Sequence, residues 1–485
     1  MAYKSERSYK LPGRPESYWI ATTKESHYPR LSGSRTFDVA VLGGGILGIT
    51  AALLLKEAGL KVGVIEAGKV VEGVTGHTTA KVTSQHHLIY KDLVEKMGTD
   101  RARQYGEANQ AALERIATLV DEREISCDLM RMPAYVYAES EEDREKVRAE
   151  VGAAQSLGLP SSFVEDPPLP FETKGAAMMR DQAQFHPRKY LCALAREIPG
   201  DGSAIFEGTR ALEIVDGEPL TVKTEHGTVQ ATDVIQATHF PFNDKPGKYS
   251  ARLYQSRSYV LAVRIKEVFP NGMFINASKP TRSLRFQPAD GDQVVLVVGD
   301  EHRTGHGGST VEHYRHLEEW ARSIYTVKSI DYRWSTQDTM SLDDVPYIGR
   351  LAEETPHQYV GTGFYKWGMT NGTAAAMILS DMILGKENPW KEVFDPARIN
   401  EPREQELMKE AINHTDKMYK EGREKERPGD PSKLGAGEGA VLKIGGELYA
   451  AYRDNDGSLH TLDPACQHRG CIVAWNDAEQ TWDCP

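Results

Sequence analysis

Three residues near the end of the chain are of types that bind transition metals. Cys466 and His468 are separated by a single residue, and Cys484 follows after fifteen more. Thiolate and neutral imidazole together suit two kinds of centre, a tetrahedral zinc site and an iron–sulfur cluster with mixed ligands. The spacing therefore predicts a metal centre at this end of the chain, with the cluster and zinc as alternatives.

A glycine motif near the start of the chain has the spacing of a dinucleotide-binding turn. Gly43, Gly45 and Gly48 lie between an expected strand and an expected helix. The first glycine makes the tight turn, the second lets the backbone approach a pyrophosphate, and the third lets the helix pack on the strand. Glu66 ends the next expected strand, where a carboxylate accepts the ribose hydroxyls. The motif predicts a bound dinucleotide and leaves FAD and NAD open.

The composition restricts the classes of function. A formal net charge of −12 repels a phosphate backbone, so we expect no nucleic-acid partner. No segment reaches the roughly 18 uncharged apolar residues of a membrane span, and residues 1–25 lack the apolar core of a secretory signal. We therefore expect a cytoplasmic protein without a membrane span.

The apolar patterns predict the elements that must position these residues. Apolar runs without alternation at 38–42 and 62–66 predict strands buried on both faces, as in a parallel sheet. Residues 90–155 have helical apolar spacing, 202–240 predicts short strands and turns, and 250–335 mixes strands with one helix.

The last part of the chain changes in character. A long helix is expected from Met369 to about Leu384, and the charged, proline-interrupted stretch after it resembles a linker. Beyond the linker, GG, DNDG and DP turns separate short strands, which predicts a small β domain.

Four segments make the chain resemble FAD-dependent oxidoreductases of the D-amino-acid oxidase/glycine oxidase superfamily, over about 38–384. They are the glycine motif with its flanking strands, the loop GVTGHTTAK, the stretch DVIQATHF, and VPYIGRL…YVGTGFYKWGMTNGTAAAMILSDMILG. The resemblance implies an α/β fold, α+β overall, in which a Rossmann-like FAD-binding domain is interleaved with a mixed-sheet substrate domain. It implies FAD as the cofactor.

The resemblance also implies which residues hold the flavin, because the family's late glycine segment returns the chain to the pyrimidine end of the ring. The expected FAD contacts are Gly43, Gly45, Gly48, Glu66, Ala67, Thr75, His77, Thr78, Thr79, Ala237, Thr238, Gly363, Trp367, Gly368, Met369 and Thr370. His77 stands where dimethylglycine and sarcosine dehydrogenases bind flavin covalently, although Gly76 replaces the bulkier residue before it. A covalent link, a hydrogen-bonding or proton-accepting role, and a structural loop position remain alternatives for His77.

Flavin oxidation of an amine needs a neutral amine in an apolar slot, but not necessarily a side-chain base. The candidate catalytic residues are His77, Lys366, Tyr254 and Arg257, and further candidates for orienting the substrate are Arg285 and His302. Several relatives grip a substrate carboxylate with a basic residue just after the late glycine loop. Thr370 stands at that position here, which weakens the case for an α-amino-acid substrate.

The C-terminal residues resemble a Rieske domain, in which C-x-H is followed after about fifteen residues by C-x-x-H. Such a domain holds a [2Fe–2S] cluster with two cysteines on one iron and two histidines on the other. Cys466, His468 and Cys484 match three ligands. The fourth is expected at position 487, and the cysteine that many Rieske domains pair with the Cys471 position is expected at 486. We therefore expect a truncated domain that binds the cluster poorly or not at all, with far less than one cluster per chain.

These resemblances imply a division of the chain. The expected parts are a lead-in at 1–36, a flavoprotein at 37–395, a charged linker at 396–432 and an incomplete Rieske-like β domain at 433–485. Within the flavoprotein, FAD-binding segments are expected at about 37–90, 180–245 and 335–390, and substrate-domain segments at about 91–179 and 246–334.

The fusion favours an enzyme that oxidises an amine or amino-acid-like small molecule with FAD, as a dehydrogenase or oxidase. In the intact relative, electrons would pass through the Rieske cluster to an external acceptor protein. The alternatives are a reductase fed through the cluster by a donor protein, and a non-catalytic electron-transfer flavoprotein. No second glycine motif for a pyridine nucleotide is apparent.

Overall fold

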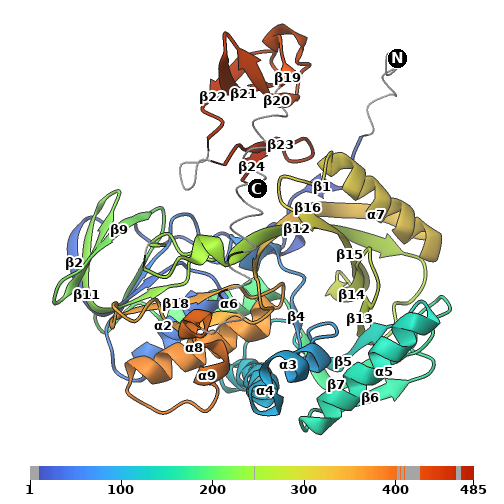
Figure 1. Cartoon of the computed structure of the whole chain (residues 1–485), viewed down its shortest axis with the longest axis horizontal. Coiled ribbons are helices and arrows are strands. Elements are labelled where there is room, and N and C mark those ends of the chain that lie inside the picture. The colour runs from blue at the N-terminus through green and yellow to red at the C-terminus, as the bar shows by residue number, and fades with distance from the viewer. Residues whose placement is uncertain are drawn as a thin grey trace.

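The computed structural model describes residues 10–244, 246–400, 405, 409, 427–465 and 471–484. Two large sheets lie side by side, and the C-terminal strands form a small module above the line where the sheets meet (Figure 1). The chain therefore has the mixed α/β architecture that the sequence predicts, with small β sheets at its end.

The first large sheet contains the glycine turn. Its strand order is β17-β18-β11-β2-β3-β8, with β10 on β11 and β9 on β10. The strands are β2 (Gly33–Leu42), β3 (Val62–Ile65), β8 (Ala204–Phe206), β9 (Ala211–Val215), β10 (Leu220–Thr224), β11 (Gly227–Gln236), β17 (Tyr347–Arg350) and β18 (Gln358–Thr362). The run β18-β11-β2-β3-β8 is parallel, and the end of β2 and all of β3 are buried, as their unbroken apolar sequences predict.

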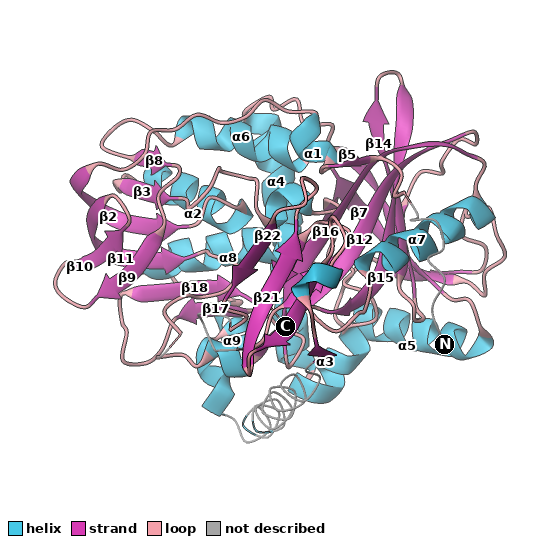
Figure 2. Cartoon of the chain, turned by 90° about the horizontal axis from the view of Figure 1, so that it is seen from above, coloured by secondary structure: helices cyan, strands magenta, loops and turns pink. Residues whose placement is uncertain are grey.

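Three helices lie against this sheet. α2 (Ile46–Glu57) contacts both α6 (Pro187–Glu197) and α8 (Gly368–Ile383), and Figure 2 shows them side by side. α2 is apolar on nearly every side because it packs against the sheet and both neighbouring helices. α8 lies within one residue of its expected bounds.

The second large sheet is mixed, with the order β1-β16-β12-β15-β14-β13-β5-β7-β4 and β6 on β7. Its strands are β1 (Arg14–Pro15), β4 (Lys81–Val82), β5 (Met130–Tyr137), β6 (Ser161–Val164), β7 (Ala176–Gln184), β12 (Leu253–Ile265), β13 (Met273–Asn276), β14 (Arg282–Ala289), β15 (Asp292–Arg303) and β16 (Val327–Ser341). β12 and β16 form a long antiparallel pair.

The remaining helices lie around this sheet and between the two sheets. They are α1 (Tyr18–Ala21), α3 (Tyr90–Met97), α4 (Thr99–Glu122), α5 (Glu141–Ser156), α7 (Thr310–Ile324), α9 (Lys391–Phe394) and the 3-10 turns at Val74–His77, Tyr249–Ala251, Pro396–Asn400 and Pro431–Lys433. The expectation of helix throughout 90–155 is wrong at β5. That segment pairs with β7 and β13, and this pairing overrides its weak helical spacing. In the part of the chain that is described, no helix is both long and apolar enough to cross a membrane.

Residues 10–36 are packed into the body. Trp19 is fully buried and donates a hydrogen bond from Nε1 to the Thr78 carbonyl, and β1 extends the second sheet alongside β16. This segment therefore supports the loop that contains Thr78.

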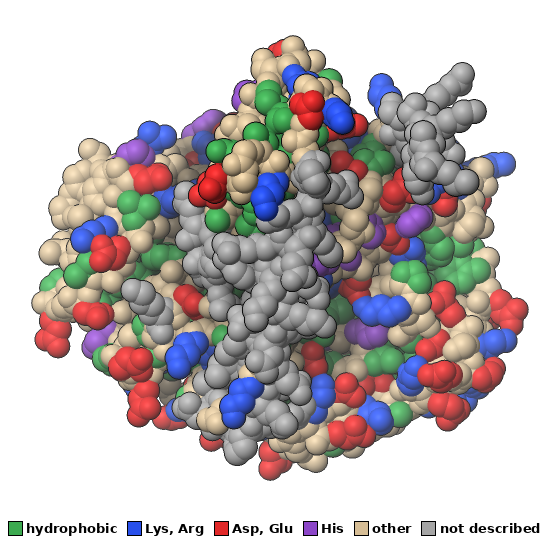
Figure 3. Space-filling model, turned by 45° about the horizontal axis from the view of Figure 1, so that its top comes forward, with side chains coloured by type: hydrophobic (Ala, Val, Ile, Leu, Met, Phe, Trp, Pro, Cys, Tyr) green, Lys and Arg blue, Asp and Glu red, His purple; other side chains and the backbone are tan. Residues whose placement is uncertain are grey.

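The C-terminal module contains two small sheets. Its strands are β19 (Arg427–Pro428), β20 (Gly439–Ile444), β21 (Glu447–Arg453), β22 (Leu459–Leu462), β23 (Ala474–Asn476) and β24 (Thr481–Asp483). β19–β22 form one sheet, and β23 and β24 form a hairpin. Figure 3 shows hydrophobic side chains on the projecting module, and Tyr449, Leu459 and Leu462 are exposed there. Most of the expected linker at 396–432 lies outside the described residues.

Candidate functional site

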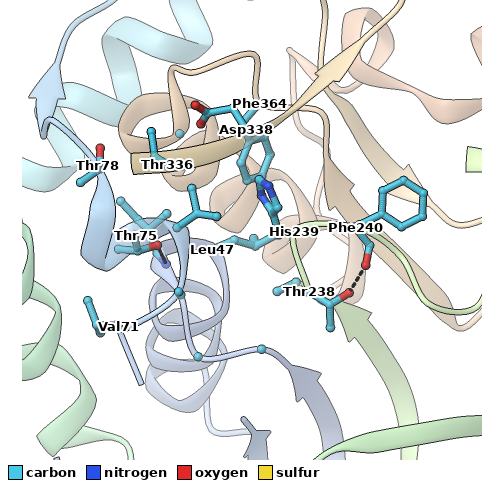
Figure 4. Close-up of a pocket in the computed structure, with 18 of the residues that line it drawn as sticks. Leu47, Val71, Thr75, Thr78, Thr238, His239, Phe240, Thr336, Asp338 and Phe364 are labelled. Carbon is cyan, nitrogen blue, oxygen red and sulfur yellow. Dashed lines mark hydrogen bonds between the residues drawn. The ribbon is translucent and has the colours of Figure 1, made fainter. Parts of the chain in front are cut away.

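A cavity of about 450 Å³ lies between the glycine turn and the β12–β16 pair. Figure 4 shows Leu47 and Thr75 on one side and Thr336 and Asp338 of β16 on the other. Eleven of the expected FAD contacts line the cavity: Gly43, Gly45, Glu66, Ala67, Thr75, Thr78, Thr79, Ala237, Thr238, Gly368 and Met369.

The glycine turn is built so that the backbone itself forms one wall of the cavity. Gly43 has φ +109°, and a Cβ there would lie 2.4 Å from the Ala237 carbonyl oxygen. A Cβ on Gly48 would lie 1.9 Å from the Gly43 oxygen, so Gly48 allows the helix to approach the turn although it does not line the cavity. Gly45 is the N-cap of α2 and has no side-chain cap. The helix N-terminus is thus available to an anion such as a pyrophosphate.

Glu66 organises the opposite edge of the turn. Its two carboxylate oxygens accept hydrogen bonds from the backbone N–H groups of Gly44, at 2.7 Å, and Gly68, at 2.8 Å. The carboxylate also lines the cavity. Its position beyond β3 is the one at which a dinucleotide ribose is bound.

The loop after the glycine turn is fixed from outside the cavity. Thr75 Oγ1 accepts a hydrogen bond from the Ile46 N–H at 3.2 Å. Arg285 is fully buried and donates to the carbonyls of Thr79 and Ala80, each at 3.0 Å. Burial lowers the pKa of Arg285 to about 9. Arg285 therefore supports the loop, and it is not among the cavity-lining residues.

Polar side chains of the second sheet line the cavity at the end away from the glycine turn. Ser258 and Thr336 are register partners on β12 and β16, and both line it, as does Asp338 two residues along β16. Lys366 donates from Nζ to Ser258 Oγ at 2.9 Å and contacts Glu301.

Two of these groups have shifted pKa values. Burial lowers the pKa of Lys366 to about 8, against the opposing effect of Asp338. Burial raises the pKa of Asp338 to about 6, and the positive charge of Lys366 limits that rise. Lys366 also has φ +70°, a left-handed conformation that non-glycine residues adopt mainly at strained functional sites.

His239 is a cavity residue that the sequence reasoning missed. It has φ +65°, and its Nε2 lies 3.0 Å from the Gln337 carbonyl oxygen. Burial lowers the pKa of His239 to about 4, so the ring is neutral near pH 7. The available signal was its place in DVIQATHF, immediately after the predicted strand and Thr238.

Several expected site residues lie elsewhere. His77 lines a second cavity of about 240 Å³, and its Nδ1 lies 2.9 Å from the Gly73 carbonyl oxygen. Thr370 donates to the Thr83 carbonyl at 3.0 Å, and Trp367 stacks on His86. The expected residues that do not line the main cavity are Gly48, His77, Gly363, Trp367, Thr370, Tyr254 and Arg257. His302, a further candidate, shares a hydrogen bond between its Nε2 and the Tyr259 hydroxyl. It also does not line the main cavity.

Arg257 lies on the side of β12 opposite Ser258. Its guanidinium forms ion pairs with Asp483 at 2.6 Å and Glu479 at 3.3 Å, both from the β23–β24 hairpin. It also donates to Ser335 and Gln337 on β16. Arg257 therefore joins the β12–β16 pair to the C-terminal hairpin.

The same hairpin caps a helix of the body. Asp477 Oδ1 accepts hydrogen bonds from the backbone N–H groups of Thr310, at 2.7 Å, and Val311, at 3.2 Å, at the N-terminus of α7. A carboxylate at this place satisfies unpaired N–H groups and complements the helix dipole. The hairpin thus contacts the body both at the β12–β16 pair and at the N-terminus of α7.

The predicted metal ligands are only partly described. Cys484 follows β24 directly, and Cys466 and His468 lie outside the described residues. Within the described ranges, Asp300, His313 and His316 also have the spacing of a cation site. However, Arg282 forms an ion pair with Asp300 at 2.7 Å. Burial lowers the pKa of His313, but its hydrogen bonds to Asp300 and to the Gly307 carbonyl, together with the charge of Asp300, raise that pKa overall. That group is an ion-pair network.

Known proteins resemble this chain over most of its length. A family model described as "FAD dependent oxidoreductase" matches residues 38–382. "Putative Rieske 2Fe-2S iron-sulfur protein YhfW" of Bacillus subtilis (strain 168) is 40% identical over 97% of this chain and 93% of that protein. "Gamma-glutamylputrescine oxidoreductase" of Escherichia coli (strain K12) is 24% identical over 76% of this chain and 89% of that protein. The crystal structure of glycine oxidase from Geobacillus kaustophilus shares the fold, with a TM-score of 0.61 and 18% identity over 74% of this chain and 98% of that chain.

Proposed function

Since the chain belongs to the family of FAD-dependent oxidoreductases, we propose that it oxidises an amine or amino-acid-like substrate in the cavity below β12 and β16. We further propose that, in an intact relative, the electrons leave through a Rieske-type [2Fe–2S] cluster in the C-terminal module, of which this chain has three ligands, Cys466, His468 and Cys484. The named activities of its relatives, glycine oxidase and γ-glutamylputrescine oxidoreductase, support the substrate class.

The residues present fit FAD at this cavity. The glycine turn leaves no room for a Cβ at Gly43 and Gly48, and the α2 N-terminus, whose N-cap Gly45 has no side chain, lies where a pyrophosphate binds. Glu66 stands at the ribose position, and Thr75, Thr78, Gly368 and Met369 line the remainder. When bound, FAD accepts a hydride from the carbon next to a neutral amine. The chain's own residues position the substrate and exclude water.

One observation supports the electron route: the β12–β16 pair borders the cavity on one face and contacts the hairpin on the other. Ser258 and Thr336 line the cavity, and Arg257 binds Asp483, the residue before the proposed ligand Cys484. Packed β layers lie about 10 Å apart, so roughly one layer separates the cavity from the hairpin. Cys466 and His468 would supply further ligands, and the name of the Bacillus subtilis relative supports this assignment.

An anaerobic experiment tests the proposed function. The FAD-loaded protein is mixed without oxygen with glycine, N-methylglycine, L-proline and putrescine in turn, and the absorbance of oxidised flavin is followed. We expect at least one amine to bleach the flavin. If dithionite bleaches it fully and no amine does, amine oxidation is wrong. If an external reduced ferredoxin-type donor then bleaches it, electrons enter from the donor side instead.

A further inference from the structure

Asp338 differs from the other charged groups around the cavity because, among the described residues, it has no hydrogen-bond or ion-pair partner. It lines the cavity on the same face of the β12–β16 pair as Ser258 and Thr336. Within the described ranges, no side chain donates a hydrogen bond to its carboxylate and no cation lies within ion-pair distance of it. Its charge is therefore left for a ligand.

The neighbouring charges are already paired. Lys366 donates to Ser258 and contacts Glu301, and Lys279 also contacts Glu301. At the other end of the cavity, Glu66 accepts two backbone N–H groups. His239 lies beside this strand, with Nε2 3.0 Å from the Gln337 carbonyl oxygen, and its low pKa keeps it neutral. Among the described residues that line the cavity, Asp338 is thus a charged group with neither a hydrogen-bond nor an ion-pair partner.

An unpaired carboxylate in a partly dehydrated wall is costly. Burial without a partner disfavours the charged form, and the pKa of Asp338 is raised to about 6 accordingly. A bound cation with N–H groups removes that cost through charge-assisted hydrogen bonds, which are about twice as strong as neutral ones. An anionic ligand group at this place adds repulsion instead.

We propose that Asp338 is the anionic anchor of the substrate site and selects compounds that carry an ammonium group. The proposal rests on the proposed function and defines its substrate class. An ammonium held by a carboxylate stays protonated, whereas the nitrogen next to the oxidised carbon must be neutral. The substrate that meets both needs has two nitrogens, one anchored as a cation and one at the reacting carbon, as in a diamine or polyamine.

A cation that cannot be oxidised measures the anchor directly. Guanidinium has no C–H bond and stays charged at every pH used. The FAD-loaded protein is titrated with millimolar guanidinium at constant ionic strength, and its dissociation constant is read from the flavin difference spectrum. Acetate serves as the anionic probe.

The expected result has a defined pH dependence. With a pKa of about 6, Asp338 is about nine-tenths ionised at pH 7 and about one-tenth ionised at pH 5. Guanidinium binding should therefore weaken about tenfold between pH 7 and pH 5. Asp338→Asn should weaken it at least about tenfold at pH 7 and abolish the pH dependence, and Asp338→Glu should restore part of both.

A matched control lies on the same strand. Asp331→Asn makes the same change of charge on β16, where Asp331 is paired with Arg264, and should leave guanidinium binding unchanged. Equal guanidinium affinity in the wild-type protein and Asp338→Asn overturns the anchor. A shifted flavin potential with unchanged cation affinity also overturns it, because Asp338 then acts on the flavin.

The amine panel separates this inference from the proposed function. If putrescine bleaches the wild-type flavin, and Asp338→Asn raises the putrescine concentration that gives half the maximal bleaching rate by tenfold or more, then both the amine oxidation and the anchor are supported. If amines bleach the two proteins alike, the anchor is wrong and the oxidoreductase stands. If no amine bleaches the wild type while guanidinium binds as described, amine oxidation fails and the cation site remains.

Discussion

The two faces of the β12–β16 pair are built from adjacent residues of the same strands, yet they do different things. Ser258 and Thr336 line the cavity. Arg257 and Ser335, one position earlier in each strand, are hydrogen-bonded to each other on the opposite face, where Arg257 binds the C-terminal hairpin. Side chains alternate between faces with a period of two, so a single pair of strands positions both sites. A slip of one residue in register would exchange the faces.

The faces differ most clearly in how their charges are compensated. On the outer face, Arg257 is buried and shared between Asp483 and Glu479. On the inner face, Asp338 has no partner within the described ranges. A compensated buried charge holds two parts of a protein together, whereas an uncompensated one at a cavity is a binding group. The outer face therefore holds the C-terminal hairpin, and the inner face is the proposed ligand site.

The largest expected effect removes the cofactor from the cavity and leaves the outer face of the β12–β16 pair intact. In Gly48→Ala, the new Cβ would lie 1.9 Å from the Gly43 carbonyl oxygen, and neither backbone segment can yield without opening the turn. Such overpacking costs about 1–3 kcal/mol or more and is concentrated at the pyrophosphate site. We expect the flavin-to-protein absorbance ratio of the purified variant to fall below about a tenth of the wild-type value.

Gly152→Ala is the control for this substitution. Gly152 lies in α5, and its added Cβ meets nothing within 4 Å, so flavin content should not change. Protection of the hairpin from proteases should persist in Gly48→Ala. Full flavin content in that variant would contradict the role given to the turn.

The second effect acts on the outer face. Arg257→Ala leaves Asp483 and Glu479 without their cation, and breaking a buried pair by removing one partner costs about 3–5 kcal/mol. We expect a protease to release the C-terminal segment at least about a hundredfold faster, with unchanged flavin content. Arg264→Ala on the same strand removes a more exposed ion pair and should change neither the rate of release nor the flavin content. Loss of flavin from Arg257→Ala would show that the two faces are not separate.

The sequence predicted the glycine-turn side of the cavity better than either face of the β12–β16 pair, and the reason is physical. The glycine motif and Glu66 act through local geometry, so residue type and spacing suffice to place them in the cavity. Thr75, Thr78 and Met369 were carried over on family motifs and also line it. The parallel strands, α2 and α8 follow directly from apolar pattern and turn residues.

The roles of Arg257 and Asp338 could not be predicted in this way. Whether a strand residue faces the cavity or the hairpin depends on strand register, and the hairpin lies more than two hundred residues further along the chain. Arg257 resembled a substrate ligand because its partners were unknown. Asp338 was overlooked because an unpaired carboxylate is recognisable only once its surroundings are known. The strand β5 was missed for a similar reason, since its identity depends on pairing with β7.

A smaller change tests how the charges of the inner face are coupled. The positive charge of Lys366 lowers the pKa of Asp338, against the larger effect of burial. Lys366→Met removes that charge, so the pKa of Asp338 should rise above about 6, by up to about one unit. Less of the carboxylate is then ionised at a given pH, and the midpoint for guanidinium binding should move to higher pH. An unchanged or lower midpoint would show that Lys366 does not act on Asp338.

The smallest expected effect concerns the second contact of the hairpin. Asp477→Ala removes the acceptor for the N–H groups of Thr310 and Val311, and losing such a cap costs about 0.5–2 kcal/mol. We expect proteolytic release of the C-terminal segment to rise about fivefold, well below the effect of Arg257→Ala. Asp477→Asn retains a capping oxygen and should raise the rate of proteolytic release less. Asp456→Ala, in an exposed turn of the module, should leave that rate unchanged. An effect of Asp477→Ala as large as that of Arg257→Ala would move the main anchor of the module from the β12–β16 pair to the α7 N-terminus, and the hairpin would then be held beside the wall of the cavity rather than by it.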